Sequence, residues 1–271
     1  MPGVLRAFLD WQIGLSRSFD RWLPRRYTID GNADFRENIL PAYITRGIVI
    51  YDIGGGSRPY IDPALKRDRS LKVIGLDIDP EELDAAPAGS YDATVCADLT
   101  AYRGRSDADL VICQAALEHV RDTERAFAAL ATIPKPGGRL AIFVPSRNAV
   151  FARLNLLLPE AVKHFLLFSI FPHKQRTHEG FKAFYDKCTP KHFAGMAHKY
   201  GFRIELQKSY FASSYFSFFT PAYVLWRLWI LLFHALAGAQ AAETFVMVLR
   251  LVEQPAERQA SPGSGQYAPS A

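Results

Sequence analysis

The sequence predicts an α/β domain in which a parallel sheet carries helices on both of its faces. Short apolar runs rich in valine and isoleucine alternate with segments of helical spacing. The runs lack a polar side, as strands buried on both faces do, and strands separated by helices favour right-handed crossovers. A chain of 271 residues holds one such domain and is too short for two large ones.

The elements are expected in a regular order along the chain. The first five strands are predicted at 48–53, 72–78, 93–97, 108–113 and 139–145, with a turn at 135–138 before the fifth. Helices are predicted at 80–85 and 123–133. A third helix, 189–200, has Thr189 as N-cap, Pro190 in its first turn and Gly201 at its end. Strands at 202–208 and 244–252 follow.

These elements define a domain at 47–253 with additions around it. Residues 1–46 are expected to form accessory helices packed on the domain, or alternatively a basic amphipathic helix that touches a membrane. Residues 146–188 and 210–240 are expected to form two aromatic-rich insertions, and 254–271 a disordered tail.

The composition limits the class of partner and the compartment. A net charge of +5 suits an anionic ligand or membrane surface and is too small to indicate nucleic acid. Cys96, Cys113 and Cys188 lack metal-ligand spacing, so we expect free thiols and no metal. No secretory signal pattern is visible. The expected location is the cytoplasm, or the inner face of the membrane.

A glycine cluster follows the first strand directly. Gly54 and Gly56 would let a ligand approach the backbone at the carboxyl edge of the sheet, because a Cβ there would fill the ligand's space. The third glycine of the dinucleotide fingerprint is replaced by Pro59, which argues against a nicotinamide or flavin cofactor. Asp52 suggests a ligand with an ammonium group. A tight turn without a ligand is the alternative.

Two further strands end in carboxylates. Asp77 follows the glycines by about 20 residues, where a ribose diol is bound in nucleotide-type sites. Asp79 is a weaker choice, and either residue could instead cap the helix that begins at Pro80. Asp98 ends the third strand and could accept from an exocyclic amine.

Five motifs in order resemble the class I S-adenosylmethionine-dependent methyltransferases, in particular the branch that methylates small molecules, quinones and sugars. They are DIGGG from Asp52, GLD at 75–77, ADL at 97–99, DLVICQAALEHV at 109–120 and PGG at 136–138. The resemblance spans about 48–146. It implies a Rossmann-like, mostly parallel sheet of seven strands whose last strand is antiparallel.

The resemblance also implies S-adenosylmethionine as cofactor and a set of residues that hold it. Asp52, Gly54 and Gly56 would face its methionine end, and Asp77 would face the ribose hydroxyls. Asp98 with Leu99 would face the adenine, and the backbone near Gln114 would contact the methionine moiety. The eight implied residues are Asp52, Gly54, Gly56, Asp77, Ile78, Asp98, Leu99 and Gln114. Arg58 stands where the family usually has its third glycine.

Methyl transfer from a sulfonium needs a base only when the acceptor must lose a proton. His119, just past the fourth strand, is the first candidate, with Tyr185 and His178 behind it. Alternatively, Glu118 and His119 only shape the loop around the cofactor.

The two insertions bear on the acceptor. Between Arg147 and Lys191 lie eight Lys/Arg against three acidic residues, which suits an anionic acceptor; a solvated loop face is the alternative. The apolar stretch 222–237, with Trp226 and Trp229, is shorter than the ~20 residues of a bilayer span. Arg227 and His234 share one stripe with Tyr223. The stretch 222–237 is expected to form a patch in the membrane interface, or else a lid over the substrate.

The sequence thus predicts a methyltransferase acting on a small or lipid-linked acceptor, with peripheral membrane contact. The alternative is an accessory protein of a biosynthetic complex that keeps the cofactor fold without transferring methyl groups.

Overall fold

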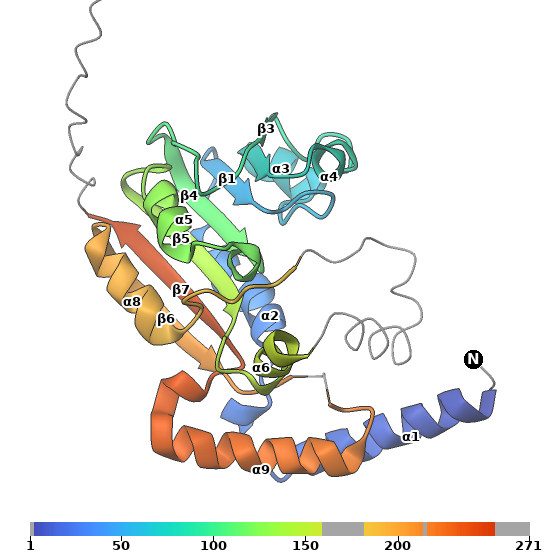
Figure 1. The fold of residues 1–271 in the computed structure, drawn as a ribbon. Coiled ribbons are helices and arrows are strands. Elements are labelled where there is room, and N and C mark those ends of the chain that lie inside the picture. The colour runs from blue at the N-terminus through green and yellow to red at the C-terminus, as the bar shows by residue number, and fades with distance from the viewer. Residues whose placement is uncertain (1–2, 159–181, 214–215, 253–271) are drawn as a thin grey trace, which may run out of the picture.

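A single sheet runs through the computed structural model, which describes residues 3–158, 182–213 and 216–252. Among these residues the strand order is β3-β2-β1-β4-β5-β7-β6, with β7 antiparallel to both neighbours and the other pairs parallel. This confirms the predicted fold class (Figure 1). The strands are β1 Val49–Ile53, β2 Lys72–Asp77, β3 Ala93–Cys96, β4 Ala108–Gln114, β5 Pro134–Pro145, β6 Phe202–Tyr210 and β7 Thr244–Leu251.

Helices cover both faces of the sheet. On one face α5 (Thr123–Leu130) and α8 (Pro190–Lys199) bury Phe127 and Phe193, whose ring centroids lie 5.5 Å apart. On the other face Phe35 stacks on Phe143 of β5 at 5.8 Å. Burying aromatic side chains on both faces makes the sheet the centre of the core.

The crossover helices on the β1–β3 side are short. Helix α4 (Pro80–Asp84) follows β2, and α3 (Pro63–Arg69) follows the glycine loop. Helix α3 was not predicted from the sequence, because none of its residues is fully buried. It is fixed instead by Asp62, whose carboxylate accepts the backbone N–H groups of Ala64 and Leu65.

Strand β5 begins five residues before the predicted start. The expected turn at 135–138 is part of the strand, and the pairing register with β4 shifts between Ala108 and Leu110. Gly137 has a φ of +80°, and a Cβ on Gly138 would lie 2.7 Å from the carbonyl oxygen of Ala108. The glycines therefore lie in an irregularity within the strand, where the pairing of β5 with β4 shifts.

Much of the predicted N-terminal leader packs on the domain. Helix α1 (Gly3–Asp20) leads through a short turn, η1 (Arg25–Tyr27), into a second helical stretch at 31–43. That stretch comprises α2 (Gly31–Asp34), the π-helical turn η2 (Phe35–Ile39) and η3 (Leu40–Tyr43). Phe35 and Leu40 are fully buried.

A short helical turn, η4 (Leu117–His119), follows β4. The described parts of the insertions add α6 (Val150–Leu157) in the first, and α9 (Thr220–Ala237) with η6 (Gly238–Ala241) in the second. Trp226, expected on the exposed apolar side with Trp229, is buried at 4% exposure, and its indole N–H donates to Glu243 at 3.3 Å. Residues 254–271, predicted as a tail, lie outside the described residues.

Candidate functional site

The glycine loop leaves β1 at the carboxyl edge of the sheet. Gly54 and Gly56 both have positive φ, at +71° and +45°, where glycine is unstrained. A Cβ on Gly54 would lie 2.6 Å from the Cβ of Ala116, on the loop after β4. The sequence reasoning assigned the glycine requirement to ligand space. In the structure it also comes from this close approach of two loops.

Asp52 holds the loop from within. Its carboxylate is almost fully buried and accepts the backbone N–H of Tyr60 at 2.8 Å. Burial raises the pKa of Asp52 to about 6, although the Tyr60 amide and the charge of Arg36 partly oppose this.

Asp77 faces the same loop from the end of β2. A Cβ on Gly56 would lie 3.2 Å from Oδ2 of Asp77, while Oδ1 accepts the backbone N–H of Asp79. Asp79 is the N-cap of α4, accepting the backbone N–H of Glu81 at 2.9 Å. The structure therefore gives the capping role to Asp79 and leaves Asp77 turned toward the loop.

The other residues predicted to bind S-adenosylmethionine lie along the same edge. Ile78 is 58% exposed, Leu99 is buried, and Asp98 accepts the backbone N–H and hydroxyl of Thr100. Gln114 ends β4 beside β1. This edge combines loop glycines, a carboxylate that faces them and an exposed apolar side chain, which fits an adenosine with an amino-acid tail. S-adenosylmethionine has this shape, and when bound it would supply an activated methyl group.

Asn32 and Arg36 were missed by the sequence reasoning. The side-chain amide of Gln114 donates to Asn32 at 2.5 Å, and Arg36 donates to Gln114 at 3.4 Å. The Arg36 guanidinium also lies 4.9 Å from the ring centroid of Tyr60, whose hydroxyl donates to the Arg36 carbonyl at 2.6 Å. Arg36 sits in the π-helical turn η2, a feature frequent at functional sites.

His119 lies beside the end of β4 with its side chain 35% exposed. Its Nδ1 is 3.3 Å from the carbonyl oxygen of Lys182, and its Nε2 is 3.9 Å from Oε1 of Glu118. Glu118 is buried, and its Oε2 has no hydrogen-bond partner among the described residues. Burial raises the pKa of Glu118 to about 8, so its neutral form is favoured at pH 7.

The returning end of the first insertion packs against this loop. The backbone N–H groups of Phe184 and Tyr185 donate to the Glu118 carbonyl at 2.7 and 3.0 Å. Tyr185 has a φ of +50°, and its side chain is 5% exposed with its ring toward Phe151. His178, the third catalytic candidate, lies outside the described residues.

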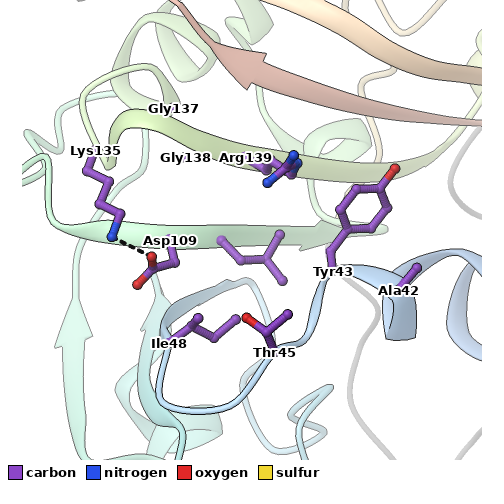
Figure 2. A pocket seen from close by; sticks show the side chains of 10 residues that line it. Ala42, Tyr43, Thr45, Ile48, Asp109, Lys135, Gly137, Gly138 and Arg139 are labelled. Atoms are coloured by element: carbon purple, nitrogen blue, oxygen red, sulfur yellow. Dashed lines mark ion pairs between the residues drawn. The ribbon is translucent and has the colours of Figure 1, made fainter.

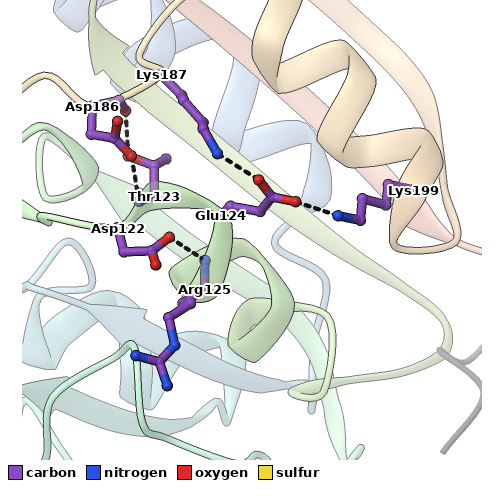
Figure 3. A network of polar contacts seen from close by, with 7 residues as sticks. All are labelled: Asp122, Thr123, Glu124, Arg125, Asp186, Lys187 and Lys199. Atoms are coloured by element: carbon purple, nitrogen blue, oxygen red, sulfur yellow. Dashed lines mark hydrogen bonds and ion pairs between the residues drawn. The ribbon is translucent and has the colours of Figure 1, made fainter. Parts of the chain in front are cut away.

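A polar clamp fixes that returning segment to α5 (Figure 3). Asp186 accepts the backbone N–H of Thr123 at 3.0 Å and, through its carbonyl, the Thr123 hydroxyl. Glu124 accepts from Lys187 at 2.5 Å and from Lys199 of α8. These two lysines lower the pKa of Glu124 to about 2. The clamp keeps the segment close to His119.

A cavity of 260 Å³ lies at the opposite, amino-terminal edge of the sheet (Figure 2). There Lys135 pairs with Asp109 at 2.5 Å, and Arg139 lies over the ring of Tyr43. None of the predicted site residues lines the cavity. The cavity is therefore separate from the carboxyl edge of the sheet, which carries the glycine loop and Asp77 and is here called the cofactor edge.

The chain resembles known proteins in sequence and in fold. Residues 51–142 match a family model described as a methyltransferase domain. No curated protein matches the chain significantly.

Solved structures with a similar fold have low sequence identity. An S-adenosylmethionine-dependent methyltransferase from Mesorhizobium loti has a TM-score of 0.52 and 17% identity, covering 81% of this chain and 99% of that one. Geranyl diphosphate C-methyltransferase from Streptomyces coelicolor, solved with Mg²⁺, geranyl diphosphate and S-adenosylhomocysteine, has a TM-score of 0.53 and 9% identity, covering 82% and 79%.

Proposed function

We propose that this protein is a class I S-adenosylmethionine-dependent methyltransferase, which the match of residues 51–142 to a methyltransferase-domain family model supports, and that it transfers the methyl group to a small or lipid-linked acceptor that bears an anionic group. The lipid-linked acceptor is favoured, reached at the cytoplasmic surface of a membrane. One observation carries this preference: the exposed apolar side of α9 belongs to the same edge of the sheet as the cofactor loop.

The strand pairing supports this common edge. Pro145, at the carboxyl end of β5, pairs with Thr244, and Thr244 pairs with Tyr210 at the end of β6. The chain enters the α9 insertion directly after Tyr210. Strands β1, β2 and β4 end at the same edge because they pair in parallel, and α9 lies at the β6 and β7 end of the sheet (Figure 1). An acceptor held in a bilayer beneath α9 would approach the sheet from the donor's side.

Exposed cations near His119 support an anionic acceptor. Arg121 and Lys182 flank the ring of Phe184, at 4.7 and 5.9 Å from its centroid. Arg147 follows the end of β5 and is exposed. Guanidinium and ammonium groups of this kind bind phosphates and carboxylates. The Streptomyces coelicolor enzyme, with the same fold, takes geranyl diphosphate, which joins an apolar chain to an anionic head.

His119 is proposed as the group that removes the acceptor's proton when the acceptor is a hydroxyl or an acidic carbon. It is partly exposed and lies beside the end of β4. Most of the rate would otherwise come from holding the acceptor in line with the donor's methyl group.

The test is transfer of label from methyl-tritiated S-adenosylmethionine. The protein is incubated with a membrane lipid extract and, separately, with an aqueous metabolite extract of the same cells. We expect label in an organic-soluble, anionic product, with no transfer by Asp77→Ala. Label confined to the aqueous extract would contradict the lipid-linked acceptor. No label in either, with the donor bound, would contradict methyl transfer to both proposed classes.

A further inference from the structure

Helix α1 turns its apolar side away from the protein. Its buried residues are polar: Gln12 and Ser16 are at most 7% exposed and bond to the start of α9. The exposed large hydrophobic residues recur at helical spacing and end in the following turn. They are Phe8, Trp11 and Leu15, with Trp22 at 87% exposure. A helix packed only for a soluble protein would have the reverse pattern.

Helix α9 also has an exposed apolar outward side, while its inward side is a mixture of apolar and polar residues. Its inward side carries Tyr223, Arg227 and His234 together with Trp226 and Ile230. Its outward side carries five large apolar residues at helical spacing, each 47–79% exposed. They are Leu225, Leu228, Trp229, Leu232 and Leu236. The stripe predicted to be polar thus faces the protein, not the solvent.

The inward polar groups lock the two helices together. Arg227 is 1% exposed and pairs with Asp20 at 2.7 Å, and its guanidinium also donates to the carbonyls of Tyr27 and Phe211. The Tyr223 hydroxyl donates to Asp20 at 2.6 Å. The contacts of this buried cation hold α1 and α9 in one arrangement, and the two helices lie side by side (Figure 1). Their outward apolar residues are together called the α1–α9 face.

Helix α9 cannot cross a bilayer while this fold is kept. Residues 220–241 are long and apolar enough to do so by length and composition, with a mean hydropathy of 1.5. However, the backbone N–H of Glu243, after α9, donates to the carbonyl of Tyr210, before it, at 2.8 Å. Both ends of the insertion therefore return to the same point of the sheet. A single spanning helix would put them on opposite sides of the membrane.

We propose that the α1–α9 face seats this protein on an anionic lipid bilayer, with both helices lying in the plane of the interface. Arg17, Arg21, Arg25 and Arg26 are exposed along the end of α1 and the turn after it, beside Trp22, and α9 contains no acidic residue. Apolar side chains flanked by arginines match acyl chains beneath anionic head groups.

Charge argues for lipid over a second copy of this chain. A two-fold interface places the same patch on both subunits, so both sides of that interface would be basic. The bilayer supplies the opposite charge. The inference rests on the proposed function only for its purpose, which is to present the cofactor edge to a lipid-linked acceptor.

Flotation with vesicles tests the proposal without any measurement of turnover. Vesicles of phosphatidylcholine with phosphatidylglycerol are compared with phosphatidylcholine alone at low and high salt. The variants are Trp11→Glu/Leu228→Glu, which changes one outward residue on each helix, and Arg21→Gln/Arg25→Gln/Arg26→Gln. Matched controls are Val252→Glu, an exposed apolar position at the other edge of the sheet, and Arg46→Gln/Arg67→Gln/Arg125→Gln, three exposed arginines elsewhere.

We expect the wild type and both controls to float with the anionic vesicles. The glutamate pair should reduce partition about 100-fold. The arginine triple should reduce it about 100-fold at low salt and much less at high salt. A folded wild type that binds S-adenosylmethionine yet stays soluble at low salt would overturn the proposal. So would a dimer, detected by light scattering, that the glutamate pair dissociates. Flotation without methyl transfer would instead count against the proposed function alone.

Discussion

Glu118 is the buried carboxyl group closest to the catalytic candidate His119. Its raised pKa, about 8 against an ordinary value of 4.5, means that the folded protein binds its proton more tightly than the unfolded chain does. Between these two pKa values the folded state holds more protons. The free energy of unfolding contributed by Glu118 is therefore full below about pH 4.5 and is lost as the pH rises through 8.

Glu118→Gln keeps the shape of the side chain and removes its titration. We expect the melting temperature of the variant, relative to wild type, to be higher at pH 9 than at pH 5, by about 2–4 °C or more. Asp52 and Glu243 also have raised pKa values and remain in both proteins, so the difference isolates Glu118. A melting-temperature difference that does not change with pH would show that Glu118 titrates normally.

His119→Ala is expected to lower the turnover number by about 10²- to 10⁴-fold, the usual cost of losing a general base. Donor affinity should stay close to wild type, because His119 is proposed to face the acceptor. Steady-state kinetics and calorimetry on the same preparation separate the two effects. His198→Ala, at an exposed position on α8, is the control. Full turnover in His119→Ala would remove it from the mechanism.

Among single residues, those at the ends of strands could be predicted from the sequence, whereas those placed by tertiary contacts could not. Asp77 and Gln114 lie at strand ends that the apolar runs define. The burial of Tyr185 depends on a left-handed backbone conformation and on the clamp at Asp186, neither of which has a local signal.

Among the elements, the five inner strands were predictable because continuous apolar runs mark strands buried on both faces. The edge strands β3 and β6 were also predicted, although β3 is largely exposed and β6 alternates between buried and exposed residues. Elements without a buried side were harder. Helix α3 depends on its cap, and the irregularity in β5 depends on an approach to β4 that only the folded sheet creates. The placement of the helical stretch 31–43 over Gln114 joins residues about 80 positions apart, so no periodicity could reveal it.

Arg36, in that stretch, gives a prediction for donor binding. Its guanidinium reaches Gln114, near which the family resemblance places the methionine moiety of the donor. We expect Arg36→Ala to weaken S-adenosylmethionine binding about tenfold. This is the loss expected for one charge-assisted hydrogen bond, reduced because the site is exposed to solvent. Binding of 5′-methylthioadenosine, which lacks the amino-acid group, should be unchanged. Equal losses for both ligands would mean that Arg36 acts only through the fold; Glu37→Ala is the exposed neighbouring control.

At the scale of the whole molecule, the cofactor edge and the α1–α9 face are joined by the strand order. Strands β6 and β7 carry the second insertion to the edge where β1, β2 and β4 end. The sequence indicated an apolar patch on 222–237. It also left open a basic amphipathic helix in 1–46, but it could not show that α1 and α9 form one face, because the pair of Asp20 and Arg227 spans 207 positions.

The edge of the sheet where β1 and β2 end is predicted to bind S-adenosylmethionine through the glycine loop and Asp77. Calorimetric titration of the full chain with S-adenosylmethionine and, separately, with NAD tests this prediction most directly. We predict one site for S-adenosylmethionine, no binding of NAD, and a loss of about 100-fold or more in Asp77→Ala, where charge-assisted hydrogen bonds to the ribose are removed. Asp79→Asn, which keeps an N-cap on α4, should bind like wild type. Binding of NAD, or unchanged S-adenosylmethionine affinity in Asp77→Ala, would contradict the account.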